Sequence, residues 1–172
     1  MEESVFLRLY EDYNRDVFSF LIYLTRNRDI AEDLMHEVYV RVLKSYGNFE
    51  GKSSEKTWLF AIAKNVSIDY FRKQATIKKH TNFHFDWETT ELVATDRLPE
   101  QLIEVDEEKR VMLEALHSCT GDQKMVILMR FFQDLTIAET ADALEWTESK
   151  VKTTQHRAIK ALQAKVREGD RA

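Results

Sequence analysis

The sequence has few of the residues that break or crosslink a chain. Its 172 residues include one proline, four glycines and one cysteine, Cys119. Scarce proline and glycine favour long helices over a turn-rich sheet protein, and a single cysteine excludes an internal disulfide. No apolar run approaches the roughly 18 residues of a membrane span, and the acidic start MEESVFLRLYEDY is unlike a signal peptide. We therefore expect a cytoplasmic protein.

Motifs of common catalytic sites are also missing. His36-Glu37 would begin a zinc-protease motif, but that motif needs a histidine where the chain has Val40. Gly51-Lys52-Ser53 is like the end of a phosphate-binding loop, but Tyr46 stands where that loop needs its first glycine. Gly-x-Ser-x-Gly, Cys-x-x-Cys and Gly-x-Gly-x-x-Gly motifs are absent. We expect no enzyme activity, no cofactor and no metal site.

The negative charge is concentrated in the middle of the chain. The net charge is −5, yet residues 81–108 hold one basic and nine acidic side chains, whereas residues 109–172 hold 11 basic and nine acidic ones. Nucleic-acid binding depends on a local basic face of the protein rather than on its net charge. The composition is therefore compatible with DNA binding at either end of the chain.

Apolar residues recur at helical spacing along most of the chain, which predicts an all-α protein. Periodicity is lost over residues 76–98, so we expect two small helical domains, 1–76 and 99–172, joined by an acidic linker, 77–98. The expected helices cover residues 3–25 (one or two helices), Asp29 to about Ser45 with Asp29 as its cap, Ser54 to about Gln74, Pro99 to Leu116, and the almost wholly apolar run Met125–Phe132. Thr120 with Gln123 forms a capping box before the last of these, which should be the buried centre of the second domain.

A helix-turn-helix is predicted between Leu135 and Leu162. Thr136 and Glu139 form a capping box that starts the first helix, Glu145-Trp146 interrupts the pattern, and Thr147 can cap the second helix. The second helix has an apolar face and a face rich in hydrogen-bond donors: Lys150, Lys152, Gln155, His156, Arg157 and Lys160. This arrangement is typical of a recognition helix that lies in a DNA major groove.

The helices expected from Asp29 and from Ser54 each carry a polar face whose role the spacing leaves open. The first presents Asp33, His36, Glu37, Arg41 and Lys44, which suit either a solvated surface or a docking surface. The second presents Trp58, Asn65, Asp69, Arg72 and Lys73. Aromatic rings stack on bases, amides read base edges and cations hold phosphates, but Trp58 could equally belong to the core and Asn65 to a solvated face.

Two stretches resemble bacterial sigma factors of the extracytoplasmic-function (ECF) group in the sigma-70 family. Residues 31–73, AEDLMHEVYVRVLKSYGNFEGKSSEKTWLFAIAKNVSIDYFRK, are similar to sigma region 2, including its Trp-Leu pair and its Ile-Ala-x-Asn-x-x-x-Asp-x-x-Arg-Lys pattern. Residues 122–162, DQKMVILMRFFQDLTIAETADALEWTESKVKTTQHRAIKAL, are similar to sigma region 4. The tracts RVLKSYGNFEGKSSEKTWL and ESKVKTTQHR look closest to the SigX-like members.

This resemblance implies a promoter-specificity subunit, monomeric when free, whose partners are core RNA polymerase, promoter DNA and an anti-sigma factor, often membrane-anchored. The implied contacts with the −35 element come from Lys150, Lys152, Thr153, Thr154, Gln155 and Arg157. The implied contacts with the −10 element come from Phe49, Gly51, Lys52, Ser53, Trp58, Asn65, Asp69, Arg72 and Lys73. Asp33, His36, Glu37 and Arg41 would dock on the β′ clamp helices, and region 4 would hold the β-flap tip.

Three positions depart from the pattern that the resemblance implies. Glu145 stands where the family usually has glycine in a left-handed turn, at a cost of about 1 kcal/mol. Trp146 replaces a smaller aliphatic residue, which would alter the angle between the two helices, and His36 replaces a common glutamine. The alternative hypothesis is a helix-turn-helix regulator with an N-terminal sensing or dimerisation domain, which would bind duplex DNA unaided as a dimer.

Overall fold

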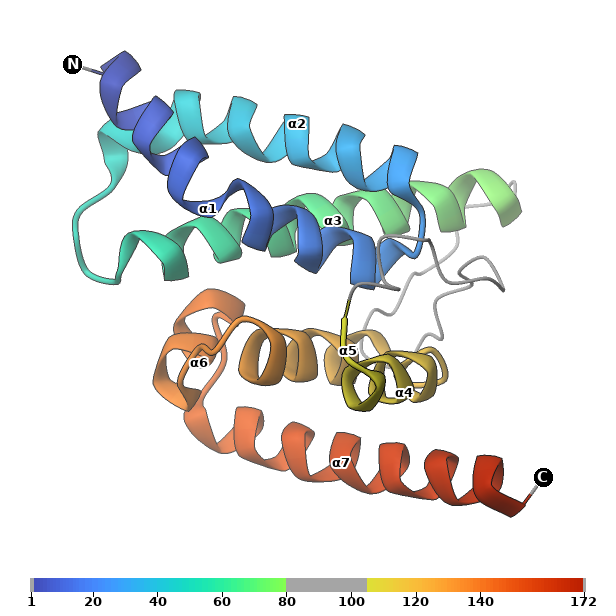
Figure 1. Cartoon of the computed structure of the whole chain (residues 1–172). Helices are drawn as coiled ribbons and strands as arrows, with labels where there is room; N and C mark the ends of the chain where they lie inside the picture. The colour runs from blue at the N-terminus through green and yellow to red at the C-terminus, as the bar shows by residue number, and fades with distance from the viewer. Residues whose placement is uncertain (1, 80–104, 172) are drawn as a thin grey trace.

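The computed structural model describes residues 2–79 and 105–171, and it is all-α over this part of the chain (Figure 1). No β-strand occurs among these residues, and none of their helices is long and apolar enough to cross a membrane. The elements in chain order are α1 (Glu2–Thr25), α2 (Arg28–Ser45), the 3₁₀ turn η1 (Tyr46–Asn48), α3 (Glu55–Lys79), α4 (Glu107–Leu116), α5 (Gly121–Ile127), the π-helical turn η3 (Leu128–Phe132), α6 (Ile137–Leu144) and α7 (Glu148–Arg171).

Helices α1, α2 and α3 form the first domain. Long apolar stripes on the three helices meet in its centre, where Phe20 and Phe60 pack edge to face at 5.4 Å between ring centroids. The expected start of α2 was wrong by two residues. The cap is Asn27, whose side chain accepts a hydrogen bond from the Ile30 N–H, and Asp29 lies inside the first turn, where its charge suits the helix dipole.

Helices α4 to α7 form the second domain around the apolar run predicted as its centre. Val126, Ile127 and Leu128 are fully buried where α5 passes into η3. Both capping boxes expected in this domain are present, at Thr120 with Gln123 and at Thr136 with Glu139. Local hydrogen bonds thus start α5 and α6 where the sequence indicates.

The two domains pack against each other mainly through α3 and α6, which lie side by side (Figure 1). Lys56 Nζ donates to the backbone carbonyl of Gln133 at 2.8 Å, and the Thr57 hydroxyl donates to Glu139 at 3.4 Å. An aromatic pair, Tyr23 with Phe132 at 5.3 Å, extends the interface to α1. This packing buries a second, polar face of α3 that the apolar pattern did not predict.

One expected helix runs further than predicted, and another is interrupted: Val105 and Asp106 are not helical, although the helix expected from Pro99 to Leu116 includes them. Helix α3 runs five residues beyond Gln74, to Lys79, and thus into the segment expected to be linker. Helix α4 begins at Glu107, capped by the side chain of Asp106, which accepts from the Lys109 N–H. The expected helix start at Pro99 and linker residues 80–98 lie outside the described residues.

Candidate nucleic-acid interface

The turn of the helix-turn-helix is a Schellman motif with a charged residue at its left-handed position. The Trp146 N–H donates to Ala141 O at 2.9 Å, and the Glu145 N–H donates to Asp142 O at 3.3 Å. Glu145 has φ 60° and ψ 40°, the conformation that favours glycine at this position. The left-handed backbone predicted for Glu145 is therefore confirmed.

The residues after the turn fix the start of α7. The Thr147 hydroxyl accepts a hydrogen bond from the Lys150 N–H at 3.1 Å, which confirms the predicted cap. The Lys150 Nζ lies 4.1 Å from the centre of the Trp146 ring and 4.0 Å from an Asp122 carboxylate oxygen. Lys150 is thus engaged by protein groups, and its ammonium strengthens the turn by a cation–π contact.

The outward face of α7 carries three of the predicted −35 residues and two donors that were left out of that set. Lys152, Thr153 and Arg157 are exposed, and so are His156 and Lys160. Lys152, His156 and Lys160 follow one another at four-residue intervals and therefore form a row on the helix. From this spacing, His156 and Lys160 could have been included in the predicted −35 contact set.

Thr154 and Gln155 turn toward the protein side of α7 and are only half exposed. Arg130 of η3 donates to the Gln155 amide oxygen at 2.9 Å and to the carbonyl of Leu135 at 2.6 Å. Arg130 therefore connects three segments of the second domain. The bond from Arg130 orients the Gln155 amide, and its N–H groups can serve as donors to another molecule.

In the first domain, the loop between η1 and α3 rests on an aromatic cluster. Phe49 stacks on Tyr46 at 6.0 Å and packs on Trp58 at 5.2 Å between ring centroids. All three rings are half-buried, so Trp58 belongs partly to the core and partly to the surface. The sequence left open whether Trp58 lies in the core or on the surface, and the structure shows that it does both.

The tip of this loop is open to solvent. Gly51 has φ +73° and no atom within 4 Å of the place where a Cβ would lie, while Lys52 is exposed and pairs with Glu50 at 2.9 Å. The Ser53 hydroxyl lies half-exposed at the end of the loop. Gly51, Lys52 and Ser53 are therefore accessible together.

Beyond the loop, the predicted polar row of α3 follows the helix outward from Trp58. Asn65, Arg72 and Lys73 are exposed. The Asp69 carboxylate accepts from Arg41 of α2 at 3.1 Å and lies 3.8 Å from Arg72. The predicted −10 residues of α3 thus share one side of the helix, where the Asp69 carboxylate pairs with Arg41 and Arg72.

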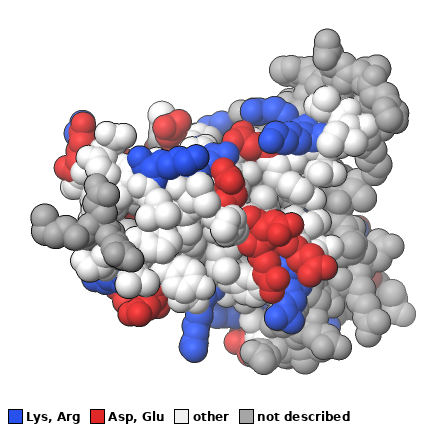
Figure 2. Space-filling view, turned by 90° about the horizontal axis from the view of Figure 1, so that it is seen from above, with Lys and Arg blue, Asp and Glu red and all other residues white. Residues whose placement is uncertain are grey.

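The predicted polymerase-docking residues of α2 lie beside this surface. Asp33, His36 and Glu37 are exposed, and Arg41 lies between Glu37, at 3.2 Å, and Asp69. Figure 2 views the molecule from above, where α1 and α2 lie nearest, and shows cations and carboxylates interspersed with uncharged surface. This pattern suits a partner of mixed charge better than it suits nucleic acid.

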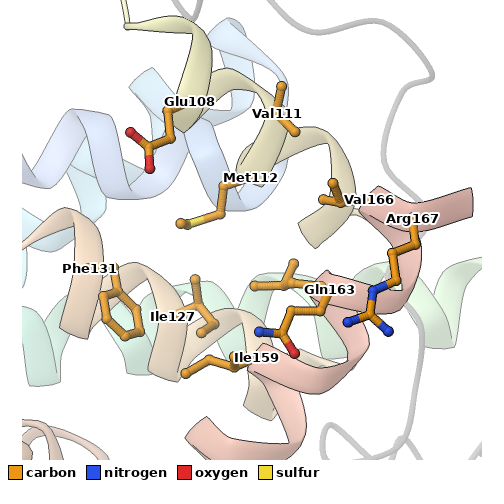
Figure 3. Close-up of a pocket in the computed structure, with 10 residues that line it drawn as sticks. Glu108, Val111, Met112, Ile127, Phe131, Ile159, Gln163, Val166 and Arg167 are labelled. Atoms are coloured by element: carbon orange, nitrogen blue, oxygen red, sulfur yellow. The ribbon is translucent and has the colours of Figure 1, made fainter. Parts of the chain in front are cut away.

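A groove of about 550 Å³ runs over the second domain between α4, α5, η3 and α7 (Figure 3). Its walls are mainly apolar, and Val111 and Phe131 remain exposed at its mouth. Glu108 and Arg167 place opposite charges on its rim. The complete lining is Glu108, Val111, Met112, Ile127, Phe131, Ile159, Leu162, Gln163, Val166 and Arg167. The sequence did not reveal this groove.

The described residues offer no cluster of three His, Cys, Asp or Glu side chains that could hold a metal ion. Cys119 is buried, and this burial raises the pKa of its thiol, so the thiolate form is disfavoured.

Comparison with known proteins assigns each domain to a family model. Residues 9–77 match the model for sigma-70 region 2, and residues 115–164 match the model for sigma-70 region 4. The chain is 49% identical to the ECF RNA polymerase sigma factor SigX of Bacillus subtilis, over 93% of this chain and 82% of that protein. It is 29% identical to the RNA polymerase sigma factor YlaC of B. subtilis, over 95% and 94%.

A solved structure shares the fold. The sigma factor RpoE of Bartonella quintana, crystallised with the anti-sigma factor NepR, superposes with a TM-score of 0.77 at 21% identity, over 94% of this chain and 96% of that one. The two sigma regions and the close similarity to SigX give the classification. The chain belongs to the sigma-70 family, as an ECF RNA polymerase sigma factor.

Proposed function

We propose that this chain binds core RNA polymerase in the cytoplasm and directs it to promoters, with one DNA-contacting surface on each domain. The observation that carries this division is the presence of two separate exposed polar faces, on α3 with its preceding loop and on α7. A helix-turn-helix alone would support only duplex binding. A second surface with an aromatic cluster and an open loop adds what single-stranded DNA requires.

In this proposal α7 enters the major groove of the −35 element. Lys152, Thr153 and Arg157 would contact DNA directly, together with His156 and Lys160 of the same face. Thr154 and Gln155 would lie at the edge of the contact, the latter presenting amide N–H donors because its oxygen is turned toward Arg130. Lys150 would act mainly by steadying the turn through Trp146.

The −10 element would open on the first domain. Asn65, Arg72 and Lys73 would contact the non-template strand along α3, with the exposed part of the Trp58 ring available for stacking and Asp69 orienting Arg72. A base flipped out of the strand would enter beside the loop residues Phe49, Gly51, Lys52 and Ser53. Phe49 would support that pocket from below, since its ring is already packed on Tyr46 and Trp58.

Polymerase would be held at two places. Asp33, His36, Glu37 and Arg41 would meet the β′ clamp helices, where complementary charges set the register. The apolar groove of the second domain would take an amphipathic helix, which suits the β-flap tip because helices bind such grooves through a row of apolar anchors. The acidic stretch of the chain that follows α3 would link the two domains.

An anti-sigma factor is the remaining proposed partner. The solved RpoE structure was obtained with one. The same exposed apolar groove and the α2 surface would be available to such a protein when polymerase is absent. We propose that this chain is held inactive in that way.

Reconstitution with core polymerase tests the proposal. The chain should co-elute with core as one copy, and the mixture should open a promoter, detected as permanganate-reactive thymines near −10. The competing hypothesis, a helix-turn-helix regulator, predicts a dimer that binds duplex DNA without polymerase. Failure to co-elute with core polymerase would overturn the sigma-factor assignment.

A further inference from the structure

The carboxylate of Glu55 joins the two ends of the loop before α3. Tyr46 stands at the start of the loop and Glu55 is the first residue of α3, directly after it. The Tyr46 hydroxyl donates to Glu55 Oε2 at 3.4 Å and so bridges the base of the loop. An acidic residue in the first turn of a helix also has a purely local role, because it suits the helix dipole.

Arg8 of α1 reaches the same carboxylate from outside the loop. Its two terminal nitrogens donate to Glu55 Oε1 at 3.0 Å and to Glu55 Oε2 at 2.7 Å. This is the two-pronged arrangement that makes arginine–carboxylate pairs geometrically specific. The hydrogen bonds and charge of Arg8 also hold the pKa of Glu55 below its usual range, which favours the ionised carboxylate.

Tyr46 belongs both to the hydrogen bonds around Glu55 and to the aromatic cluster under the loop. Tyr46 contributes its hydroxyl to Glu55 and its ring to Phe49 and Trp58, which lie 6.0 and 5.8 Å away between centroids. The loop is therefore fixed from its start through Phe49 and again at Glu55. Only the tip, around Gly51, is left without such support.

We propose that Arg8 is a positioning residue for the −10 loop: through Glu55 and Tyr46 it holds the loop in the shape that receives DNA. This inference rests on the proposed function of the loop. Ordering a flexible loop at the moment of binding weakens affinity, and a prearranged loop avoids that loss. Arg8 lies on α1, outside every residue assigned above to DNA or polymerase.

The test compares Arg8→Gln, Glu55→Gln and the charge swap Arg8→Glu/Glu55→Arg in the full chain bound to core polymerase. The probe is a fluorescent single strand copying the non-template −10 region of a promoter that the wild-type holoenzyme transcribes, defined by 5′-end mapping. Arg28→Gln is the matched control, because Arg28 forms an exposed pair with Glu32 at 3.0 Å on α2, away from the loop.

Both single variants should bind the −10 strand roughly fivefold more weakly, as expected for one partly exposed two-pronged pair. They should also discriminate less between the −10 strand and a scrambled strand, whereas core binding and −35 duplex binding stay unchanged. The swap should regain most of the affinity and discrimination. A role limited to stability would lower the melting temperature without changing discrimination.

Unchanged strand binding in Arg8→Gln, or an equal loss in Arg28→Gln, would overturn the inference. So would a loss that the swap does not recover. Failure of the proposed function looks different, because the wild-type holoenzyme would then bind the −10 strand no better than the scrambled strand.

Discussion

Lys56 of the first domain donates a 2.8 Å hydrogen bond to the carbonyl of Gln133 in the second. Gln133 is buried, with 3% of its surface exposed, and Lys56 is half-buried. Lys64, further along α3, is 7% exposed in the same interface, and burial lowers its pKa against the opposing charge of Glu145. Polar interfaces of this kind separate more easily than apolar ones.

With α3 packed against α6, the two domains lie too close together to reach both promoter elements at once. Sites named −35 and −10 are about 25 base pairs apart, or roughly 85 Å at the rise of B-DNA, whereas a compact chain of this length has a radius of gyration of about 16 Å. We therefore expect the contact between α3 and α6 to open on the polymerase. Dyes at Glu11→Cys and Ala164→Cys, in a Cys119→Ala background, should lose energy transfer when core polymerase is added.

A pair of dyes within the first domain, at Glu11→Cys and Gln74→Cys, is the control and should keep its transfer efficiency. Equal efficiency of the interdomain pair before and after polymerase binding would contradict the expected opening.

Arg157→Ala should weaken binding to the −35 duplex and make it less dependent on salt. Removing one phosphate-binding cation lowers the slope of log affinity against log salt by about 0.9. Titrating holoenzyme with a −35 duplex at several salt concentrations measures this slope. Lys165→Ala is the control, since Lys165 lies two turns further along α7 and pairs with Glu168 at 3.5 Å. An unchanged slope in Arg157→Ala would show that this residue does not touch the DNA backbone.

Asn65→Ala should impair the use of the −10 sequence while leaving polymerase binding intact. The side chain is exposed on α3, so its removal should change the free energy of unfolding by less than about 0.5 kcal/mol. Gln74→Ala provides an exposed amide on the opposite side of the same helix. Permanganate footprints and core-binding titrations should separate the two variants. Unfolding of Asn65→Ala would show that Asn65 supports the core.

Glu145→Gly should be more stable than Glu145→Ala by about 1 kcal/mol, because only glycine adopts φ 60° without strain. Both variants lose the carboxylate near Lys64, so their difference isolates the backbone. Chemical denaturation gives the comparison, and the corresponding shift in melting temperature is roughly 2–4 °C. Equal stability of the two would mean that the turn relaxes out of the left-handed region.

Tyr39→Phe should keep or raise stability. The Tyr39 hydroxyl is buried and has no hydrogen-bond partner among the described residues, and burial raises the pKa of Tyr39 well above its usual value. Removing an unsatisfied buried hydroxyl relieves a desolvation cost of about 1 kcal/mol or more. Tyr46→Phe, which loses a bond to Glu55, should instead be destabilised. Parallel thermal melts compare the two, and a clear loss in Tyr39→Phe would reveal an unseen partner.

Much of the fold could be read from the chain because helix signals are local. Thr136 with Glu139, and Thr120 with Gln123, lie three residues apart and form the capping boxes expected of them. The start of α2 was missed because Asn27 and Asp29 are both good caps, and only the backbone conformation distinguishes them. The extension of α3 to Lys79 was missed because the apolar pattern fades before the helix ends.

The candidate site was predicted less completely than the fold. Exposure of Asn65, Lys152 and Arg157 agrees with their predicted faces. The engagement of Gln155 by Arg130, and of Lys150 by Trp146, could not be read from a helical wheel that shows only which residues share a side. His156 and Lys160 were left out of the contact set although their spacing from Lys152 was available.

The sequence by itself determined the family, through the two stretches that carry its motifs. It also determined most of the helices, both capping boxes and the left-handed turn at Glu145. These follow from residues within a few positions of one another, since helical hydrogen bonds and capping reach only three or four residues. The tertiary structure alone decided which polar residues became partners. Arg130 and Gln155 are 25 positions apart, Arg8 and Glu55 are 47 apart, and Lys56 and Gln133 are 77 apart. Such pairs depend on how whole helices pack, and no local pattern specifies that packing.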